Sequence, residues 1–133
     1  YVLIEGSNPP QYNNGFADFA DKNIRPFLDR FKAGDGRMIG SAITNLDGYL
    51  QTHLSERCHT PGPDPVWNDE HCRNKRIFMD ETTRKACESD KPAMLATYRM
   101  ELGDKYIPVK NVFVPLWANG RRWGNFELAY RDE

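Results

Sequence analysis

The sequence predicts an α+β domain built on one antiparallel sheet, with a helical region at the N-terminus and a second helix inserted into the sheet. Three observations lead to this prediction. Apolar residues recur at helical spacing over residues 16–31, five segments of strand character follow from residue 38 onward, and a proline-rich stretch separates the second of these segments from the third. A chain of 133 residues supports one domain with one core. We expect residues 1–36 to form the helical region and residues 37–133 to form the sheet domain.

The predicted long N-terminal helix follows an irregular lead-in over residues 1–11, where Gly6 and Pro9-Pro10 disfavour regular structure. Pro26 lies inside the helix and should kink it or begin a new turn, because proline lacks the backbone N–H that a helix interior needs. Gly34-Asp35-Gly36 ends the element. The apolar residues at spacings of three and four form one stripe along the helix: Phe16, Phe19, Ala20, Ile24, Phe27, Leu28 and Phe31.

The five predicted strands form an antiparallel sheet with one long insertion. Asp47-Gly48 supplies the positive φ of a tight turn between the first two strands, and Asn119-Gly120 is a strong hairpin pattern before the last one. Between the second and third strands we expect a loop over residues 55–72, rich in proline, and then a helix over residues 73–88. The strands themselves are expected at residues 38–43, 49–54, 94–102, 106–117 and 122–130.

Composition and residue pairing exclude several classes of function. A net charge of −1 argues against nucleic-acid binding, which requires a clear basic excess. We also expect no enzyme, because the possible nucleophile–base pairs, Cys58-His59 and His71-Cys72, are adjacent, and adjacent side chains on a strand point to opposite faces. No glycine-rich phosphate loop and no signal-peptide pattern are present. No apolar run approaches the roughly 18 residues that span a bilayer.

Four segments between Asn45 and Arg131 together match the pattern of a known family. They are Asp47-Gly48-Tyr49-Leu50 with His53, Cys72–Phe78 with Asp80, Leu95–Asp104, and Gly120–Gly124 with Tyr130-Arg131. In this order they resemble the extracytoplasmic sensing domains of bacterial methyl-accepting chemotaxis receptors, in the Cache (PAS-like) group. The resemblance implies a PAS-like single Cache domain with a receptor function.

The resemblance also implies a cellular setting. Such a domain lies on the periplasmic or extracellular side of the bacterial inner membrane and forms a parallel homodimer through its N-terminal helices. The chain begins with Tyr1 rather than Met, so we expect a fragment whose membrane helices lie just outside both ends. Related sensors also drive histidine kinases or diguanylate cyclases, which leaves the output module open.

In Cache domains the ligand lies between the sheet and the segments that link its second and third strands. Arg73, Arg76 and Asp80 are therefore the leading candidates. An arginine can clasp a carboxylate with two hydrogen bonds, and the aspartate can accept from an amine or hold an arginine. On a helix, Arg76, Asp80 and Arg84 would share one face, for which a solvated ion-pair ladder is the alternative. The remaining candidate ligand-binding residues are Tyr49, His53, Trp67, Tyr98 and Lys110.

Each of these remaining candidates also has a purely structural interpretation. On the strand that starts at Met94, Tyr98 and Arg99 point to opposite faces, so only one of them can face a pocket. Lys110 either points outward into solvent or needs an anionic partner. His53 could be a structural histidine, and Trp67 could simply close the loop. The basic residues favour a small anion as the ligand, a carboxylate or an amino acid.

The three cysteines allow two interpretations. Cys58, His59, His71 and Cys72 are residue types that bind zinc, although their spacing fits neither CxxC nor HxxxH. A Cys58–Cys72 disulfide is the simpler explanation; it would close a loop of about 15 residues, stabilise the fold by roughly 3 kcal/mol, and leave Cys87 as a free thiol. The oxidising compartment implied by the resemblance favours it. Some related sensors bind haem through CxxCH, of which this chain retains only the last two residues, Cys58-His59.

Two other classes of function therefore remain beside small-molecule sensing. The domain could sense metal or redox state through the cysteine–histidine loop. It could also be a structural dimerisation module that has no ligand of its own.

Overall fold

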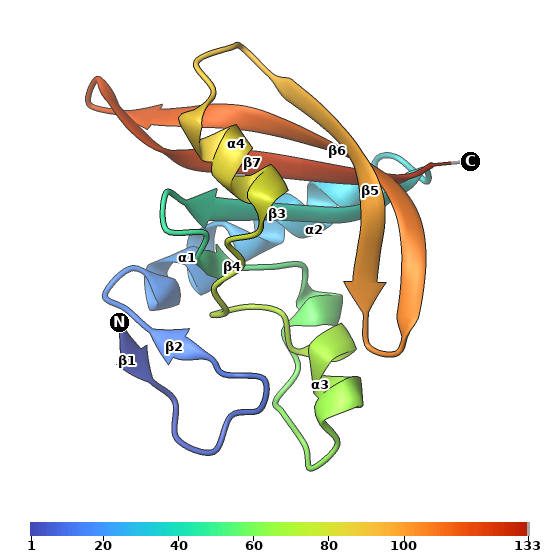
Figure 1. Ribbon diagram of the computed structural model, residues 1–133. Helices are drawn as coiled ribbons and strands as arrows, with labels where there is room; N and C mark the ends of the chain where they lie inside the picture. Colours follow the sequence, from blue (N-terminus) through green and yellow to red (C-terminus); the bar gives the residue numbers. More distant parts are fainter. Residues whose placement is uncertain (133) are drawn as a thin grey trace.

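The computed structural model describes residues 1–132. Its centre is a five-stranded sheet in the order β4-β3-β7-β6-β5, in which every neighbouring pair is antiparallel. Figure 1 shows this sheet with helices on both sides. The predicted α+β class and five-stranded antiparallel sheet are confirmed. The strands are β3 (Met38–Asn45), β4 (Leu50–Thr52), β5 (Met94–Leu102), β6 (Lys105–Ala118) and β7 (Arg121–Arg131).

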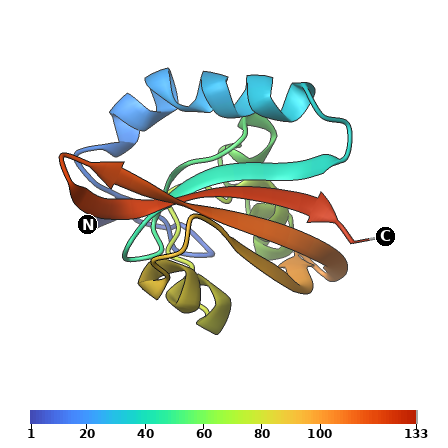
Figure 2. The ribbon, with the colours of Figure 1, turned by 90° about the horizontal axis from the view of Figure 1, so that it is seen from above.

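One face of the sheet is covered by α1 (Ala17–Asn23) and α2 (Arg25–Ala33), which run end to end across it (Figure 2). The predicted single long helix is therefore two helices, with a break at Ile24. Pro26 lies in the first turn of α2, where the missing N–H has no helical partner to lose. The proline thus begins a helix, one of the two outcomes that its position predicted.

The hydrophobic core lies between these two helices and the sheet. Leu28 of α2, Ile43 of β3 and Leu54 are buried together. Burying an aliphatic side chain of this size stabilises a fold by roughly 1.5–3 kcal/mol. The core fixes the sheet, and with it the side chains on the opposite face. Partly buried apolar side chains complete this core: Ile24, Leu116, Trp123 and Phe126.

The other face of the sheet is covered by irregular chain, by α4 (Glu81–Glu88) and, at one end, by α3 (Pro65–His71) (Figures 1 and 2). The segment predicted as a loop, residues 55–72, contains the 3₁₀ turn η1 (Ser55–Arg57) and α3. Asp64 caps α3 by accepting a hydrogen bond from the backbone of Val66, and Pro65 occupies the first turn. Two short strands near the N-terminus, β1 (Val2–Leu3) and β2 (Tyr12–Asn13), pair with each other.

The helix predicted over residues 73–88 forms only in its last part, as α4. Residues 75–78 instead pair with the turn between β3 and β4: Leu50 N donates to Arg76 O (2.9 Å) and Phe78 N to Gly48 O (2.8 Å). Gly48 has a φ of +76°, and a Cβ atom there would lie 2.2 Å from Phe78 O. Because residues 73–80 are not helical, the expected helical face of Arg76, Asp80 and Arg84 does not exist.

No helix in residues 1–132 combines the length and the apolar character that crossing a bilayer requires.

Candidate ligand-binding cavity

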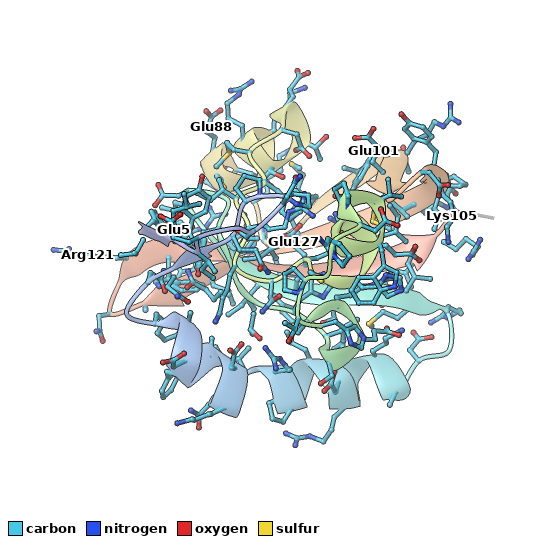
Figure 3. All side chains as sticks on the ribbon, turned by 90° about the horizontal axis from the view of Figure 1, so that it is seen from below. Glu5, Glu88, Glu101, Lys105, Arg121 and Glu127 are labelled. Carbon is cyan, nitrogen blue, oxygen red and sulfur yellow. The ribbon has the colours of Figure 1, made fainter. Side chains whose placement is uncertain are left out.

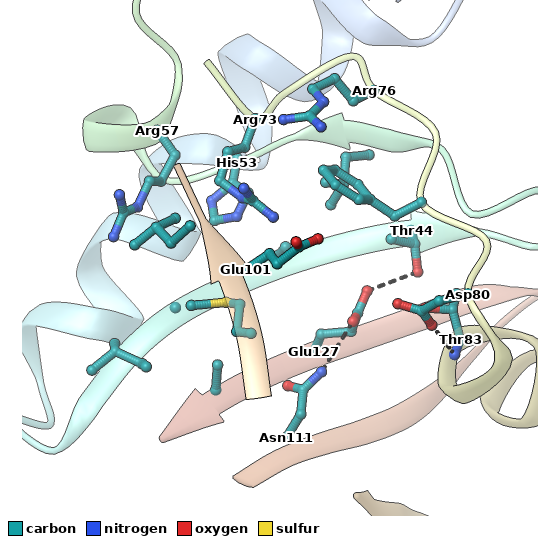
Figure 4. Close-up of a pocket in the computed structure, with 18 of the residues that line it drawn as sticks. Thr44, His53, Arg57, Arg73, Arg76, Asp80, Thr83, Glu101, Asn111 and Glu127 are labelled. Atoms are coloured by element: carbon teal, nitrogen blue, oxygen red, sulfur yellow. Dashed lines mark hydrogen bonds between the residues drawn. The ribbon is translucent and has the colours of Figure 1, made fainter. Parts of the chain in front are cut away.

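A cavity of about 440 Å³ lies between the sheet and the chain that links β4 to α4 (Figure 4). Its floor is the face of the sheet opposite to α1 and α2. Its basic end comes from the segments before and after α3, and its acidic end from β7 and the start of α4. The polar and charged residues of its wall are Ser41, Thr44, His53, Arg57, Asp69, Arg73, Arg76, Asp80, Thr83, Tyr98, Arg99, Glu101, Asn111 and Glu127.

Three arginines form the basic end: Arg57, Arg73 and Arg76. The side chains of Arg73 and Arg76 are each only 12% exposed. Asp69 holds both of them, since Arg73 donates to its backbone oxygen at 2.7 Å and Arg76 to its Oδ1 at 2.9 Å. Their guanidinium carbons lie 4.8 and 4.5 Å from the centre of the Phe78 ring. Within residues 1–132, these protein hydrogen bonds involve only the Nη1 atoms, so Nε and Nη2 of both arginines remain available.

The positive charge at this end is only partly compensated. Burial and the neighbouring charge of Arg76 lower the pKa of Arg73 to about 10, although Asp69 acts in the opposite direction. Burial, together with the nearby Arg73 and Arg57, lowers the pKa of His53 to about 3, so this imidazole is neutral. Its Nδ1 accepts a hydrogen bond from the backbone N–H of Leu54 at 2.7 Å, which places the proton on Nε2. The basic end therefore offers charged and neutral donors to an anion.

The acidic end contains Glu127 of β7 and Asp80. Glu127 accepts hydrogen bonds from Thr44 (3.0 Å) and from Nδ2 of Asn111 (3.2 Å). Figure 3 shows Glu127 near the centre of the molecule, whereas Glu88, Glu101, Lys105 and Arg121 lie toward its edges. Burial and the charge of Asp80 raise the pKa of Glu127 to about 7, although the two hydrogen bonds act in the opposite direction. Asp80 is exposed at the rim, where its Oδ1 caps α4 by accepting from Thr83 N at 2.8 Å.

One buried acceptor at this end lacks a partner. Oδ1 of Asn111 makes no hydrogen bond to any described residue, although the side chain is buried in the cavity wall. Its Nδ2 also lies 3.3 Å from the hydroxyl of Tyr98. Burial and the charge of Glu127 raise the pKa of Tyr98 to about 12, so the phenol keeps its proton.

Five of the eight predicted ligand-binding residues line this cavity: His53, Arg73, Arg76, Asp80 and Tyr98. The predicted alternation along β5 is observed. Tyr98 faces the cavity. Arg99 also borders the cavity, but its guanidinium lies 5.1 Å from the ring centre of Tyr106 on the outer face.

The other three predicted residues lie away from the cavity. Lys110 is half exposed, and its Nζ lies 3.4 Å from Oδ1 of Asp132. Its side chain is on the outer face of β6 because alternate residues of a strand point to opposite faces. Trp67 stacks on His71 on the exposed side of α3, with 4.4 Å between ring centres. Tyr49 is fully buried, and its hydroxyl donates to the backbone oxygen of Tyr12 at 2.6 Å.

The sequence analysis missed several wall residues, notably Arg57, Asn111 and Glu127. A pattern that could have identified two of them is present. On its own face of β6, Asn111 stands between the apolar residues Val109 and Phe113, and Glu127 follows Asn125 at strand spacing on β7. Both therefore place polar groups on the face that a second layer covers. Arg57 has no such pattern, because it belongs to η1 rather than to a strand.

The cysteines and histidines of the alternative metal site, Cys58, His59, His71 and Cys72, do not converge. Cys58 and Cys72 face each other as unlinked thiols, and the ring centres of His59 and His71 are 6.0 Å apart. No three or more His, Cys, Asp or Glu side chains in the described part of the chain are arranged to hold a metal ion.

The sequence gives no significant match to any protein-family model or to any curated protein.

Proposed function

We propose that this chain is the extracytoplasmic ligand-binding domain of a bacterial chemotaxis receptor, with a PAS-like single Cache fold. It binds a small carboxylate, in the first place an amino acid, and signals through the membrane segments that follow it. The observation that supports this most is the charge distribution of the cavity. Three arginines form one end and two carboxyl groups lie at the other.

The basic end suits a carboxylate. Arg73 and Arg76 keep two donor nitrogens each after their contacts with Asp69, and Nε2 of His53 adds a neutral donor. A hydrogen bond to a charged group contributes roughly 1.5–3 kcal/mol, and low exposure reduces screening by solvent. A bound carboxylate would also relieve the repulsion between the two arginines, which contributes to the low pKa of Arg73.

The acidic end suits an ammonium group. Glu127, Asp80 and the unpartnered Oδ1 of Asn111 are acceptors on one side of the cavity. An ammonium presents three donors, so it can bind several acceptors at once. A ligand with both groups places opposite charges against both ends, which is why an amino acid fits better than a simple carboxylate.

The positions of the four resembling segments support the family assignment. The segment from Cys72 to Phe78 supplies Arg73 and Arg76, and the first segment supplies His53. Tyr98 and the strand that bears Glu127 come from the other two regions. Segments that are distant in sequence thus meet at one cavity. This is expected if the segments resemble the family because they bind a ligand.

A route from the cavity to the C-terminal strand passes through α4. Asp80 caps the N-terminus of α4 at the cavity rim. At the other end of α4, Arg122 of β7 donates to Ala86 O (2.9 Å) and Ser89 O (2.6 Å). A ligand that moves α4 therefore pulls on β7, which leads to the proposed membrane segment. The ligand shifts this equilibrium only by its differential affinity for the two states.

The proposed homodimer packs through α1 and α2. Three large apolar side chains of these helices are partly exposed: Phe19, Phe27 and Phe31, of which the last two also contact the Phe126 ring of β7. A second copy of the chain would cover this surface and place both C-termini on the same side. The alternative is that the domain belongs to a histidine kinase or a diguanylate cyclase, in which the same cavity would bind the ligand. The output module therefore needs a separate test.

A thermal-shift screen tests the binding proposal. The chain is screened with amino acids, small carboxylates, purines and divalent metals, with chelator and reductant controls. A ligand at 100 times its Kd stabilises the fold by about 2.7 kcal/mol, which raises the Tm by several degrees. We expect the rise with amino acids. No rise with any compound, together with a fall in Tm on chelation, would contradict the proposal.

A further inference from the structure

Cys58 and Cys72 occupy directly opposite positions in an isolated antiparallel bridge. His59 N donates to His71 O at 3.0 Å, and Arg73 N donates to Arg57 O at 2.7 Å. These two hydrogen bonds flank the cysteines, which makes them a non-hydrogen-bonded pair. The Cα atoms of such a pair are typically about 4.5 Å apart, which falls within the range of about 4.4–6.8 Å that disulfides adopt.

Both side chains also lie on one face of this bridge, as opposite residues of an antiparallel pair do. The Cys58 thiol contacts the backbone oxygen of His53 at 3.4 Å, and the Cys72 sulfur lies 4.0 Å from Oδ1 of Asn68. Thiols are weak hydrogen-bond donors, so little stabilisation is lost when each side chain rotates about χ1 toward the other cysteine. The backbone therefore already has the arrangement that a disulfide needs.

The two cysteines are adjacent in sequence to two arginines of the cavity. Arg57 precedes Cys58 and Arg73 follows Cys72, and both arginines line the basic end. Two backbone hydrogen bonds flank the bridge that joins these two segments. Any opening of this bridge separates Arg57 from Arg73.

We propose that Cys58 and Cys72 form a disulfide when the chain folds in an oxidising compartment, and that this bond fixes the arginine end of the cavity. In the reaction the two thiols lose two protons and two electrons to a disulfide oxidant, which is cleaved to two thiols. The inference concerns the covalent state of the chain and does not rest on the proposed ligand.

The environment of the thiols indicates when the bond forms. Burial raises the pKa of Cys58 to about 11 and also raises the pKa of Cys72. Thiolates are the reacting species, so the folded, reduced chain reacts slowly with an oxidant. The disulfide forms while residues 58–72 are still accessible during folding, and afterwards it resists reduction. It is a structural bond and not a rapid redox switch.

Cys87 provides a control within the same chain. Its sulfur accepts a hydrogen bond from Nδ2 of Asn125 at 3.7 Å, on α4 and away from the bridge. It has no opposite cysteine, since Cys58 and Cys72 face each other. We therefore expect Cys87 to stay a thiol.

The experiment is to refold the denatured, reduced chain in a glutathione redox buffer and to map its cysteines by mass spectrometry. We expect a loss of about 2 Da, a peptide pair linking Cys58 to Cys72, and a Tm about 10 °C above that of the reduced chain. The Cys58→Ser and Cys72→Ser variants should lose this rise, and Cys87→Ser should keep it. Amide exchange at Arg73, measured without any ligand, should slow by at least about tenfold in the oxidised chain.

Three results would each overturn the proposal. The first is a refolded chain that keeps three free thiols. The second is a bond that involves Cys87. The third is a Cys58–Cys72 bond that leaves both the Tm and the exchange at Arg73 unchanged.

Discussion

Asp69 Oδ1 lies 2.9 Å from Nη1 of Arg76, and Asp69 Oδ2 accepts a hydrogen bond from the backbone N–H of Gly103 at 2.8 Å. One carboxylate thus attaches α3 to the β5–β6 turn and orients the arginine at the same time. It occupies one nitrogen of the guanidinium and, within residues 1–132, leaves the other two without a protein hydrogen bond. The Arg76 side chain is preorganised because Asp69, its partner, is itself held by the backbone of Gly103.

The first prediction concerns Arg76. The Arg76→Ala change should weaken binding of the amino acid that gives the largest Tm rise by about 1.5–3 kcal/mol, which is roughly 10- to 150-fold in Kd. Arg84→Ala is the matched control, because Arg84 pairs with Glu88 on the exposed side of α4. Calorimetric titration measures both. Equal affinities for the two variants would remove Arg76 from the site.

The second prediction concerns stability and the protonation of Glu127. Its pKa is raised from 4.5 to about 7 in the folded chain, so between these values the folded state binds more protons than the unfolded state. Stability from this group is fully present below pH 4.5 and is lost as the pH rises through 7, by up to ~3 kcal/mol. Glu127→Gln should flatten this slope and gain stability relative to the native chain at pH 8. Urea unfolding at several pH values measures it; parallel slopes for the two proteins would contradict the assignment.

The third prediction concerns the ligand's ammonium group. Either form of Glu127 can accept a hydrogen bond, but only the ionised form also attracts the ammonium by its charge. Affinity for the amino acid should therefore rise by up to about tenfold per pH unit from pH 5.5 to 7 and level off above it. Glu127→Gln should bind more weakly above pH 7 and lose the pH dependence. A native chain whose Kd is constant over this range would exclude Glu127 as the ammonium acceptor.

The fourth prediction separates two roles of Asp80. Asp80→Ala removes the cap of α4 and should cost about 0.5–2 kcal/mol of stability, whereas Asp80→Asn keeps a capping oxygen and should cost much less. Both changes remove the charge at the cavity rim, so both should weaken amino-acid binding. If Asp80→Asn binds as tightly as the native chain, Asp80 is only a cap.

The fifth prediction concerns the turn that positions Arg76. Gly48 has a φ of +76°, and a Cβ there would lie 2.2 Å from Phe78 O, so Gly48→Ala must displace residues 76–78. We expect a loss of more than about 1 kcal/mol of stability, and weaker ligand binding. Gly62→Ala is the control, because a Cβ at Gly62 meets no atom within 4 Å. Similar Tm values for both variants would contradict the close approach.

Much of the fold could be predicted because its determinants are local. β5 begins and ends where its alternating pattern does, and the hairpin at Asn119-Gly120 has the positive φ values that these residues favour. The segment from Arg73 to Asp80 could not be predicted in this way. Its sequence allows a helix, but pairing with residues 48–50 determines its conformation, and that contact is not encoded in the segment itself.

The candidate site was predictable only in part for the same reason. Arg73, Arg76 and Asp80 belong to one segment that resembles a known pattern, so they could be identified. Glu127 faces them from a strand some fifty residues later, and only the register of β7 with β3 brings it into the wall. Lys110 shows the converse, since its position on the strand points it to the other face.

The central claim is that one cavity recognises both ends of an amino acid. The most direct test is a set of calorimetric titrations of the chain with the best amino acid from the screen, with its deaminated acid and with its carboxamide. We expect both analogues to bind at least about tenfold more weakly, each losing at least one charged contact. Equal affinity of all three compounds would show that neither the arginine end nor the glutamate end selects the ligand, and would contradict the account.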